Sequence, residues 1–100
     1  MSGGRVVVSG MICAQPGQGG ATWAVLQFLL GLRRLGWQVH FVEVLDPASL
    51  VPAGTSLDRS DNASYLAATL SRFGLDGCWT LLERGGTAAV GVPPRELEWI

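Results

Sequence analysis

The feature that most constrains this chain is a glycine-rich stretch, residues 9–22, which separates a short apolar run from a long apolar segment. The stretch has the sequence SGMICAQPGQGGAT, and the run before it is Val6-Val7-Val8. A glycine-rich loop between a buried strand and a helix leaves backbone N–H groups free at the positive end of the helix. The stretch therefore predicts a strand–loop–helix unit whose loop can hold a phosphate or another anion.

The elements on either side of this stretch follow from periodicity. Residues 5–10 are a β-branched run flanked by glycines, which predicts a strand buried on both faces of a parallel sheet. A helix is expected from Gly20 or Ala21 to Leu35, with Gly36 as its stop. Its expected core-facing stripe is Ala21, Ala24, Val25, Phe28, Leu29, Leu32 and Leu35. Further apolar residues lie off this stripe, so the helix is apolar nearly all round, which predicts burial on more than one side.

The rest of the chain continues the same alternation of strands and helices. Residues 37–44 predict a second strand, residues 46–60 a loop, and residues 78–83 a third strand followed by a loop at residues 84–92. A second helix is expected from a cap at Ser60 or Asp61 to Phe73. Another helix is expected to begin at Pro93-Pro94 and to continue through residues 95–100. We therefore expect one α/β domain, residues 1–100, with a Rossmann-like parallel sheet and flanking helices, truncated at its C-terminus.

Composition narrows the class of partner. Of the 100 residues, 48% are hydrophobic and 15% are charged, whereas an average globular protein has about 25% charged residues. This excess of apolar residues predicts a domain that another domain or a second copy covers. The formal net charge of −1, with seven Arg and no Lys, argues against nucleic acid or an anionic membrane as a partner.

Cysteines, histidine and hydrophobic segments restrict the chemistry further. Cys13 and Cys78 are far apart in sequence and His40 is the single histidine, so we expect free thiols, no metal site and no bound cofactor. His40 lies in mid-strand, where a packed, hydrogen-bonded histidine is more usual than a catalytic base. The N-terminus has no signal-peptide core, and the longest apolar region is too short to span a bilayer, which predicts a cytoplasmic protein. The sequence Asn62-Ala63-Ser64 matches a glycosylation sequon, but it falls in the first turn of a predicted helix.

Several templates for the glycine-rich stretch can be compared. A P-loop requires GxxxxGK[ST], and the stretch contains no lysine, so this template fails. A dinucleotide fingerprint beginning at Gly17 would use Glu43 as the ribose-binding acid, but its third glycine position falls on Thr22 and the loop is too long. In a third interpretation, the glycines only make room for the loop to cross the sheet edge.

A fourth interpretation rests on a family resemblance. The sequence GGATWAVL at residues 19–26, followed by RRLGWQV at residues 33–39, resembles the opening of GT-B glycosyltransferases. Members of that family commonly begin with a strand, a glycine-containing loop, a helix ending in a Leu-x-x-x-Gly segment and a second strand. The resemblance covers residues 5–45 well and the remainder only by the order of its elements.

The resemblance implies the acceptor-side, N-terminal half of a bacterial enzyme that moves a sugar from a nucleotide-sugar donor to an acceptor hydroxyl. Gly19, Gly20, Ala21 and Thr22 would then lie at the donor diphosphate, with Thr22 either capping the helix or contacting the ligand. Gln18, Glu43 and Asp46 are the candidate acceptor-side residues. Many family members carry a histidine in the first loop as the base, and residues 9–22 contain none, so the catalytic base is not assigned.

In that family, a C-terminal domain supplies most of the donor-binding residues. We therefore expect this polypeptide to be an inactive fragment without such a domain. The alternative is a stand-alone nucleotide-binding or interaction module without catalysis, in which the apolar excess forms a homodimer interface.

Overall fold

Four strands and two α-helices form the part of the chain that the computed structural model describes, residues 4–13 and 19–93. In chain order, the elements are β1 (Arg5–Ser9), α1 (Gly19–Arg34), β2 (Gln38–Leu45), two 3₁₀ turns η1 (Pro47–Ser49) and η2 (Leu57–Arg59), α2 (Asp61–Arg72), β3 (Trp79–Glu83) and β4 (Ala89–Gly91). Gln18 and the helix expected at residues 95–100 lie outside the described residues.

The strands form one mixed sheet in the order β1-β2-β3-β4. β1 pairs with β2 in parallel, with Val8 opposite Phe41, and β2 pairs with β3 in parallel, with Phe41 opposite Trp79. β4 pairs antiparallel with β3. The expected α/β class is therefore correct, but the expectation of a loop throughout residues 84–92 is wrong. β4 has only three residues, two of them Ala and Gly, which is too short for a periodic signal.

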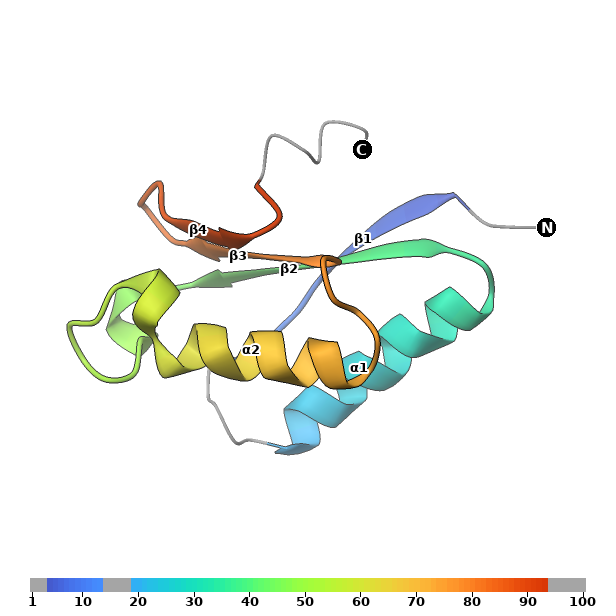
Figure 1. Cartoon of the computed structure of the whole chain (residues 1–100), viewed down its shortest axis with the longest axis horizontal. Helices are drawn as coiled ribbons and strands as arrows, with labels where there is room; N and C mark the ends of the chain where they lie inside the picture. Colours follow the sequence, from blue (N-terminus) through green and yellow to red (C-terminus); the bar gives the residue numbers. More distant parts are fainter. Residues whose placement is uncertain (1–3, 14–18, 94–100) are drawn as a thin grey trace.

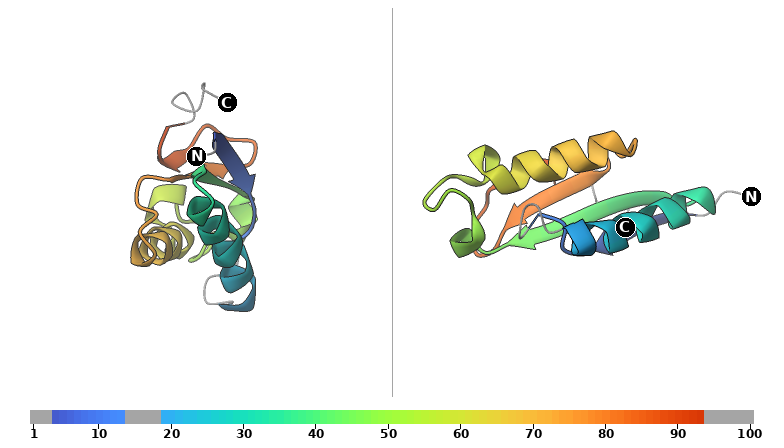
Figure 2. Two further views of the ribbon diagram at one scale, coloured as in Figure 1. Left: turned by 90° about the vertical axis from the view of Figure 1, so that its right-hand side faces the viewer. Right: turned by 90° about the horizontal axis from the view of Figure 1, so that it is seen from below.

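Both α-helices lie on the same face of the sheet (Figures 1 and 2). Crossovers between parallel strands are almost always right-handed, so two successive crossovers that step in one direction put both helices on one side. The odd-numbered residues of β2 (Val39, Phe41, Glu43 and Leu45) are buried on this side, together with Leu26 and Leu29 of α1 and Leu66 and Leu70 of α2. Burial of each such leucine contributes about 1.5–3 kcal/mol.

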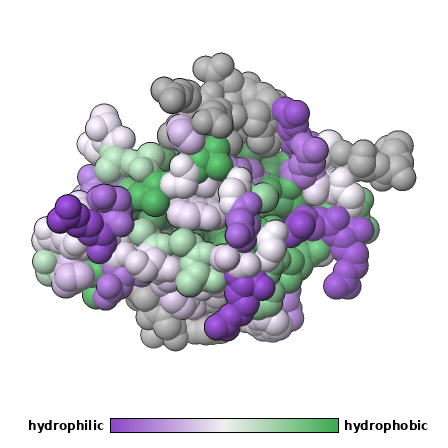
Figure 3. Space-filling model, in the orientation of Figure 1, coloured by the Kyte–Doolittle hydropathy of each residue, from purple (hydrophilic) through white to green (hydrophobic). Residues whose placement is uncertain are grey.

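The buried face of α1 differs from the expected stripe. Leu26 and Leu29 form its buried side, whereas Phe28 is 58% and Leu35 is 70% exposed. The expected stripe is correct for Leu29, and its Val25 and Leu32 pack against the core, but it omits Leu26. Apolar residues surround the whole helix, so their spacing does not indicate which side meets the sheet. In the space-filling view, hydrophobic patches lie among strongly hydrophilic side chains over the right-hand part, the side on which α1 lies in Figure 1 (Figure 3).

The second helix begins and ends with the signals that its sequence contains. The Ser60 side chain accepts a hydrogen bond from the Ala63 backbone N–H, which makes Ser60 the N-cap. The predicted stops Gly36 and Gly74 each lie two residues beyond the end of a helix. Arg33 Nη1 donates to the Gly74 carbonyl oxygen at 2.8 Å, which joins the end of α1 to the end of α2.

Two glycines near β4 provide a test of how tightly this edge of the sheet is packed. Gly85 (φ +75°) and Gly91 (φ +87°) both have left-handed backbones, but a Cβ atom at Gly91 would lie 2.5 Å from the Trp79 carbonyl oxygen, whereas a Cβ at Gly85 would meet nothing within 4 Å. We expect Gly85→Ala to lower the free energy of unfolding by about 1–2 kcal/mol. Gly91→Ala should lower it by roughly 1–3 kcal/mol more. Urea denaturation measures both, and equal losses would contradict the packing at Gly91.

Candidate functional site

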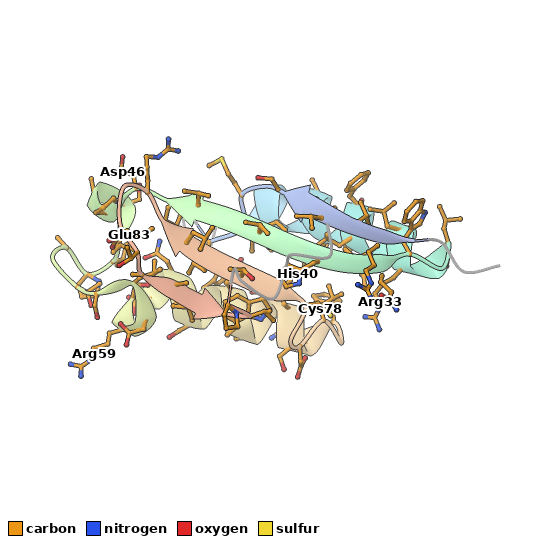
Figure 4. The ribbon with its side chains drawn as sticks, turned by 90° about the horizontal axis from the view of Figure 1, so that it is seen from above. Arg33, His40, Asp46, Arg59, Cys78 and Glu83 are labelled. Atoms are coloured by element: carbon orange, nitrogen blue, oxygen red, sulfur yellow. The ribbon has the colours of Figure 1, made fainter. Side chains whose placement is uncertain are left out.

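The carboxyl ends of β1, β2 and β3 meet at one edge of the sheet, which is where open α/β sheets bind ligands. The segment after β1 leads toward α1, Asp46 follows β2, and Glu83 ends β3. Asp46 and Glu83 lie at the same end of the sheet in Figure 4, and Arg33 lies toward the other end. The candidate site is therefore the carboxyl edge around the β1–α1 connection.

A buried carboxylate holds the beginning of that connection. The Glu43 side chain is 1% exposed, and its Oε1 accepts hydrogen bonds from the backbone N–H groups of Ile12 at 2.7 Å and Cys13 at 3.1 Å. Its Oε2 lies 3.2 Å from the same Cys13 nitrogen. Successive N–H groups that converge on an anion form a concave binding site, and bonds to a charged acceptor are stronger than neutral ones. Glu43 therefore ties the segment after β1 to the neighbouring strand.

Asn62, in the first turn of α2, makes a second set of hydrogen bonds to the segment after β1. Its Nδ2 donates to the carbonyl oxygens of Cys13 at 2.7 Å and Ser49 at 3.2 Å, and its Oδ1 accepts from the Val51 N–H at 2.8 Å. The side chain is fully buried, so the sequon at this position is not accessible for glycosylation. Asn62 joins the segments that follow β1 and β2 to the start of α2.

Thr22, in α1, makes a third hydrogen-bonded contact with the segment after β1. Its Oγ1 donates to the Ile12 carbonyl oxygen at 3.3 Å and lies 3.0 Å from the Tyr65 hydroxyl of α2. Of the two roles considered for Thr22, capping the helix is wrong, because α1 begins three residues earlier, at Gly19. Thr22 and Glu43, two of the predicted site residues, thus hold the same residue, Ile12.

The other predicted residues are placed differently. Gly19, Gly20 and Ala21 form the first turn of α1, where backbone N–H groups have no partner within the helix. Asp46 is exposed, and its Oδ1 accepts from the Ala48 N–H at 3.0 Å, which caps the short η1 turn. Asp46 makes none of the hydrogen bonds that join Glu43, Thr22 and Asn62 to the β1–α1 connection.

Cys13 lies within this network, but it is not a nucleophile. It is fully buried, and burial together with the nearby Glu43 carboxylate raises the pKa of its thiol far above the ordinary value. The thiol is therefore protonated at neutral pH and unreactive. Both Cys13 and Cys78 are free, as the sequence predicts.

His40 lies on the opposite face of the sheet. Its Nε2 is 2.8 Å from Thr80 Oγ1, and that hydroxyl donates its proton to the Val92 carbonyl oxygen at 2.7 Å. Thr80 must therefore accept from His40, which assigns the ring proton to Nε2. The ring is 6% exposed, and burial lowers the pKa of His40 below its ordinary value of 6.5. The expectation of a packed, hydrogen-bonded histidine is confirmed.

Asn62 and Tyr65 are the site residues that the sequence did not indicate. In the sequence, Asn62 belongs to a sequon, and Tyr65 is one residue of the second predicted helix. Their partners Cys13 and Thr22 are 49 and 43 positions away in the chain. No local pattern reports hydrogen bonds over such separations.

Comparison of the chain with models of protein families, with curated proteins and with solved structures finds no match. Within residues 4–13 and 19–93, no group of three or more His, Cys, Asp and Glu side chains is arranged to hold a metal ion. No helix in the same part of the chain has the length and apolar character needed to cross a membrane. Functional inference therefore depends on the chain's own residues.

The Glu43 network leads to a stability prediction. Glu43→Gln preserves the shape of the side chain but removes the charge and one acceptor oxygen, so we expect the free energy of unfolding to fall by about 2 kcal/mol. Glu83→Gln is the matched control, because Glu83 ends the adjacent strand and makes no side-chain hydrogen bond with the described residues; it should change stability by less than about 0.5 kcal/mol. Equal effects in urea denaturation would rule out a special role for Glu43.

His40 leads to a prediction about pH. Because the pKa of His40 is lower in the folded than in the unfolded chain, the unfolded chain binds more protons once the pH falls below about 6.5, and stability decreases there. The stability that depends on a neutral His40 is fully present above that pH. It is lost as the pH falls toward the pKa of His40 in the folded chain. His40→Gln should flatten the dependence of unfolding free energy on pH between about 7.5 and 5.5. An unchanged slope would contradict a neutral, buried histidine.

Proposed function

We propose that this chain is the N-terminal, acceptor-side part of a bacterial, cytoplasmic GT-B glycosyltransferase with a Rossmann-like fold. In this proposal the enzyme transfers a sugar from a nucleotide-sugar donor to an acceptor hydroxyl, with no metal or resident cofactor. A separate donor-binding domain completes the active site. The observation that carries the proposal is the glycine pair Gly19-Gly20 in the first turn of α1, within a segment that resembles the opening of that family.

The first turn of α1 suits a diphosphate leaving group. Unpaired N–H groups and the helix dipole favour negative charge at this end, and the absence of side chains at Gly19 and Gly20 lets a phosphate approach the backbone closely. Oriented backbone donors of this kind stabilise charge that develops as the glycosidic bond to the diphosphate breaks.

The other predicted residues take supporting roles in the proposal. Both carboxylate oxygens of Glu43 already accept hydrogen bonds from backbone amides. Glu43 is therefore assigned a positioning role, in which it holds the β1–α1 connection through the amides of Ile12 and Cys13. Thr22 positions the start of α1 in the same way, through the Ile12 carbonyl oxygen. The exposed Asp46 at the end of β2 remains a candidate for contact with the acceptor, as does Gln18, which lies outside the described residues.

A second candidate function is a stand-alone nucleotide-binding or homodimeric interaction module. The outer face of α1 favours it, because Phe28, Gly31, Leu32 and Leu35 line a largely apolar surface hollow on this helix. Large exposed apolar side chains that cluster in this way are typical of protein contacts. The same face would serve the leading proposal as a contact with the donor-binding domain.

Amide chemical shifts test the leading proposal on the 100-residue chain. On titration with a nucleoside diphosphate, the amides of Gly19, Gly20 and Ala21 should shift, because they contact the phosphates. Gly20→Val should weaken this binding by about tenfold or more, since its side chain occupies the space of the phosphate. Gly31→Ala is the matched control: Gly31 is on the same helix, a Cβ there meets nothing within 4 Å, and binding should not change.

Two results would count against this assignment. Equal binding by the Gly20 and Gly31 variants would remove the glycine pair from the site. A concentration-dependent dimer in sedimentation, lost on Phe28→Ser and unaccompanied by nucleotide binding, would favour the interaction module.

When the chain is combined with a donor-binding domain, Gly20→Val should also abolish sugar transfer.

A further inference from the structure

A groove runs between the two helices. It has a volume of about 360 Å³ and is lined by Thr22 and Trp23 from α1 and by Tyr65, Arg72 and Phe73 from α2, among others. This volume lies within the range of small-molecule sites, which combine apolar and aromatic walls with a few polar groups. Small residues of α2, such as Ala68, keep the groove open.

One end of the groove is aromatic. The rings of Trp23 and Phe73 are in contact, with centroids 5.9 Å apart and planes tilted by 57°. Trp23 is 51% exposed, although burial of a tryptophan side chain contributes more stabilising free energy than burial of most other side chains. This end therefore offers an apolar surface to a flat ring.

The same end carries a single cationic side chain. Arg72 is in the last turn of α2, next to Phe73, and its guanidinium makes no hydrogen bond or ion pair with the residues that the structure describes. A guanidinium binds carboxylates through two parallel N–H groups. With one cation lining the groove, the matching ligand is a monoanion.

The other end presents a hydrogen-bond acceptor. The Thr22 hydroxyl donates its one proton to the Ile12 carbonyl oxygen, so its 3.0 Å contact with Tyr65 requires Tyr65 to donate. The lone pairs of the Tyr65 hydroxyl are then available to accept from a ligand. Tyr65 and Arg72 are seven residues apart in α2, which separates them by about 10 Å along the helix axis.

We propose that this groove is a binding site for a small aromatic carboxylate that carries a hydrogen-bond donor at its far end. The ring packs on Trp23 and Phe73, the carboxylate pairs with Arg72, and the donor contacts the Tyr65 hydroxyl. The inference does not depend on sugar transfer, since it uses none of the glycine-loop amides. Thr22, which lines the groove, also donates a hydrogen bond to the carbonyl oxygen of Ile12.

The test uses 4-hydroxycinnamate, in which a conjugated ring separates a phenol hydroxyl from a carboxylate. Titration of the 100-residue chain, followed by amide chemical shifts, should give saturable shifts in both helices with a dissociation constant of about 1 mM. Arg72→Gln should weaken binding by about tenfold, and so should replacement of the probe by its neutral amide. Arg34→Gln is the matched control, because Arg34 is also an exposed last-turn arginine but does not line the groove; it should have no effect.

A second comparison tests the Tyr65 end. Tyr65→Phe should weaken binding of 4-hydroxycinnamate about threefold but leave the affinity for cinnamate, which lacks the hydroxyl, unchanged. The proposal is overturned if shifts do not saturate well above the expected dissociation constant, if the acid and its amide bind equally, or if Arg34→Gln weakens binding as much as Arg72→Gln. Equal losses for the two probes in Tyr65→Phe would likewise overturn the assigned orientation.

Discussion

The arrangement around the carboxyl edge depends on one interaction, between the buried Glu43 carboxylate and the backbone N–H groups of Ile12 and Cys13. A buried charge is costly unless hydrogen bonds replace its hydration, and here the segment after β1 supplies them. The segment in turn gains a fixed position, because the amides of Ile12 and Cys13 have a charged acceptor on the neighbouring strand. Asn62 and Thr22 then bind the carbonyl groups of the same two residues. Both helices are thereby joined to the end of β1.

The apolar surface of α1 is a second feature that any proposed function must explain. The helix buries Leu26 and Leu29 against the sheet but leaves Phe28 exposed, and Leu35, directly after the helix, is exposed as well. Such a helix has two apolar sides and only one of them is covered by the described elements. The uncovered side is compatible with a second domain in an enzyme or with a second copy in an interaction module. The groove with Trp23, in contrast, is bounded by α2 of the same domain.

The sequence indicated some features of the carboxyl edge and missed others. The glycine pair at the start of α1 was predictable, since a strand, a glycine-rich loop and an apolar helix follow one another in the chain. Glu43 was a candidate acceptor-side residue, and the structure shows its oxygens engaged by backbone amides. Asn62 and Tyr65 were not recognised, because their roles come from partners more than forty positions away. Periodicity describes neighbours along an element and contains no information about such pairs.

By itself, the sequence determined the order and type of the main elements: β-branched runs, a helical apolar repeat and stops at Gly36 and Gly74 are local properties of the backbone and its side chains. It also determined that the thiols are free and that few charges cover the surface. Only the tertiary structure decided which side of α1 is buried, that β4 runs antiparallel, and that Glu43 binds main-chain amides rather than facing outward. These outcomes depend on which segments meet across the sheet, because burial and hydrogen bonding are energies of pairs that folding alone brings together.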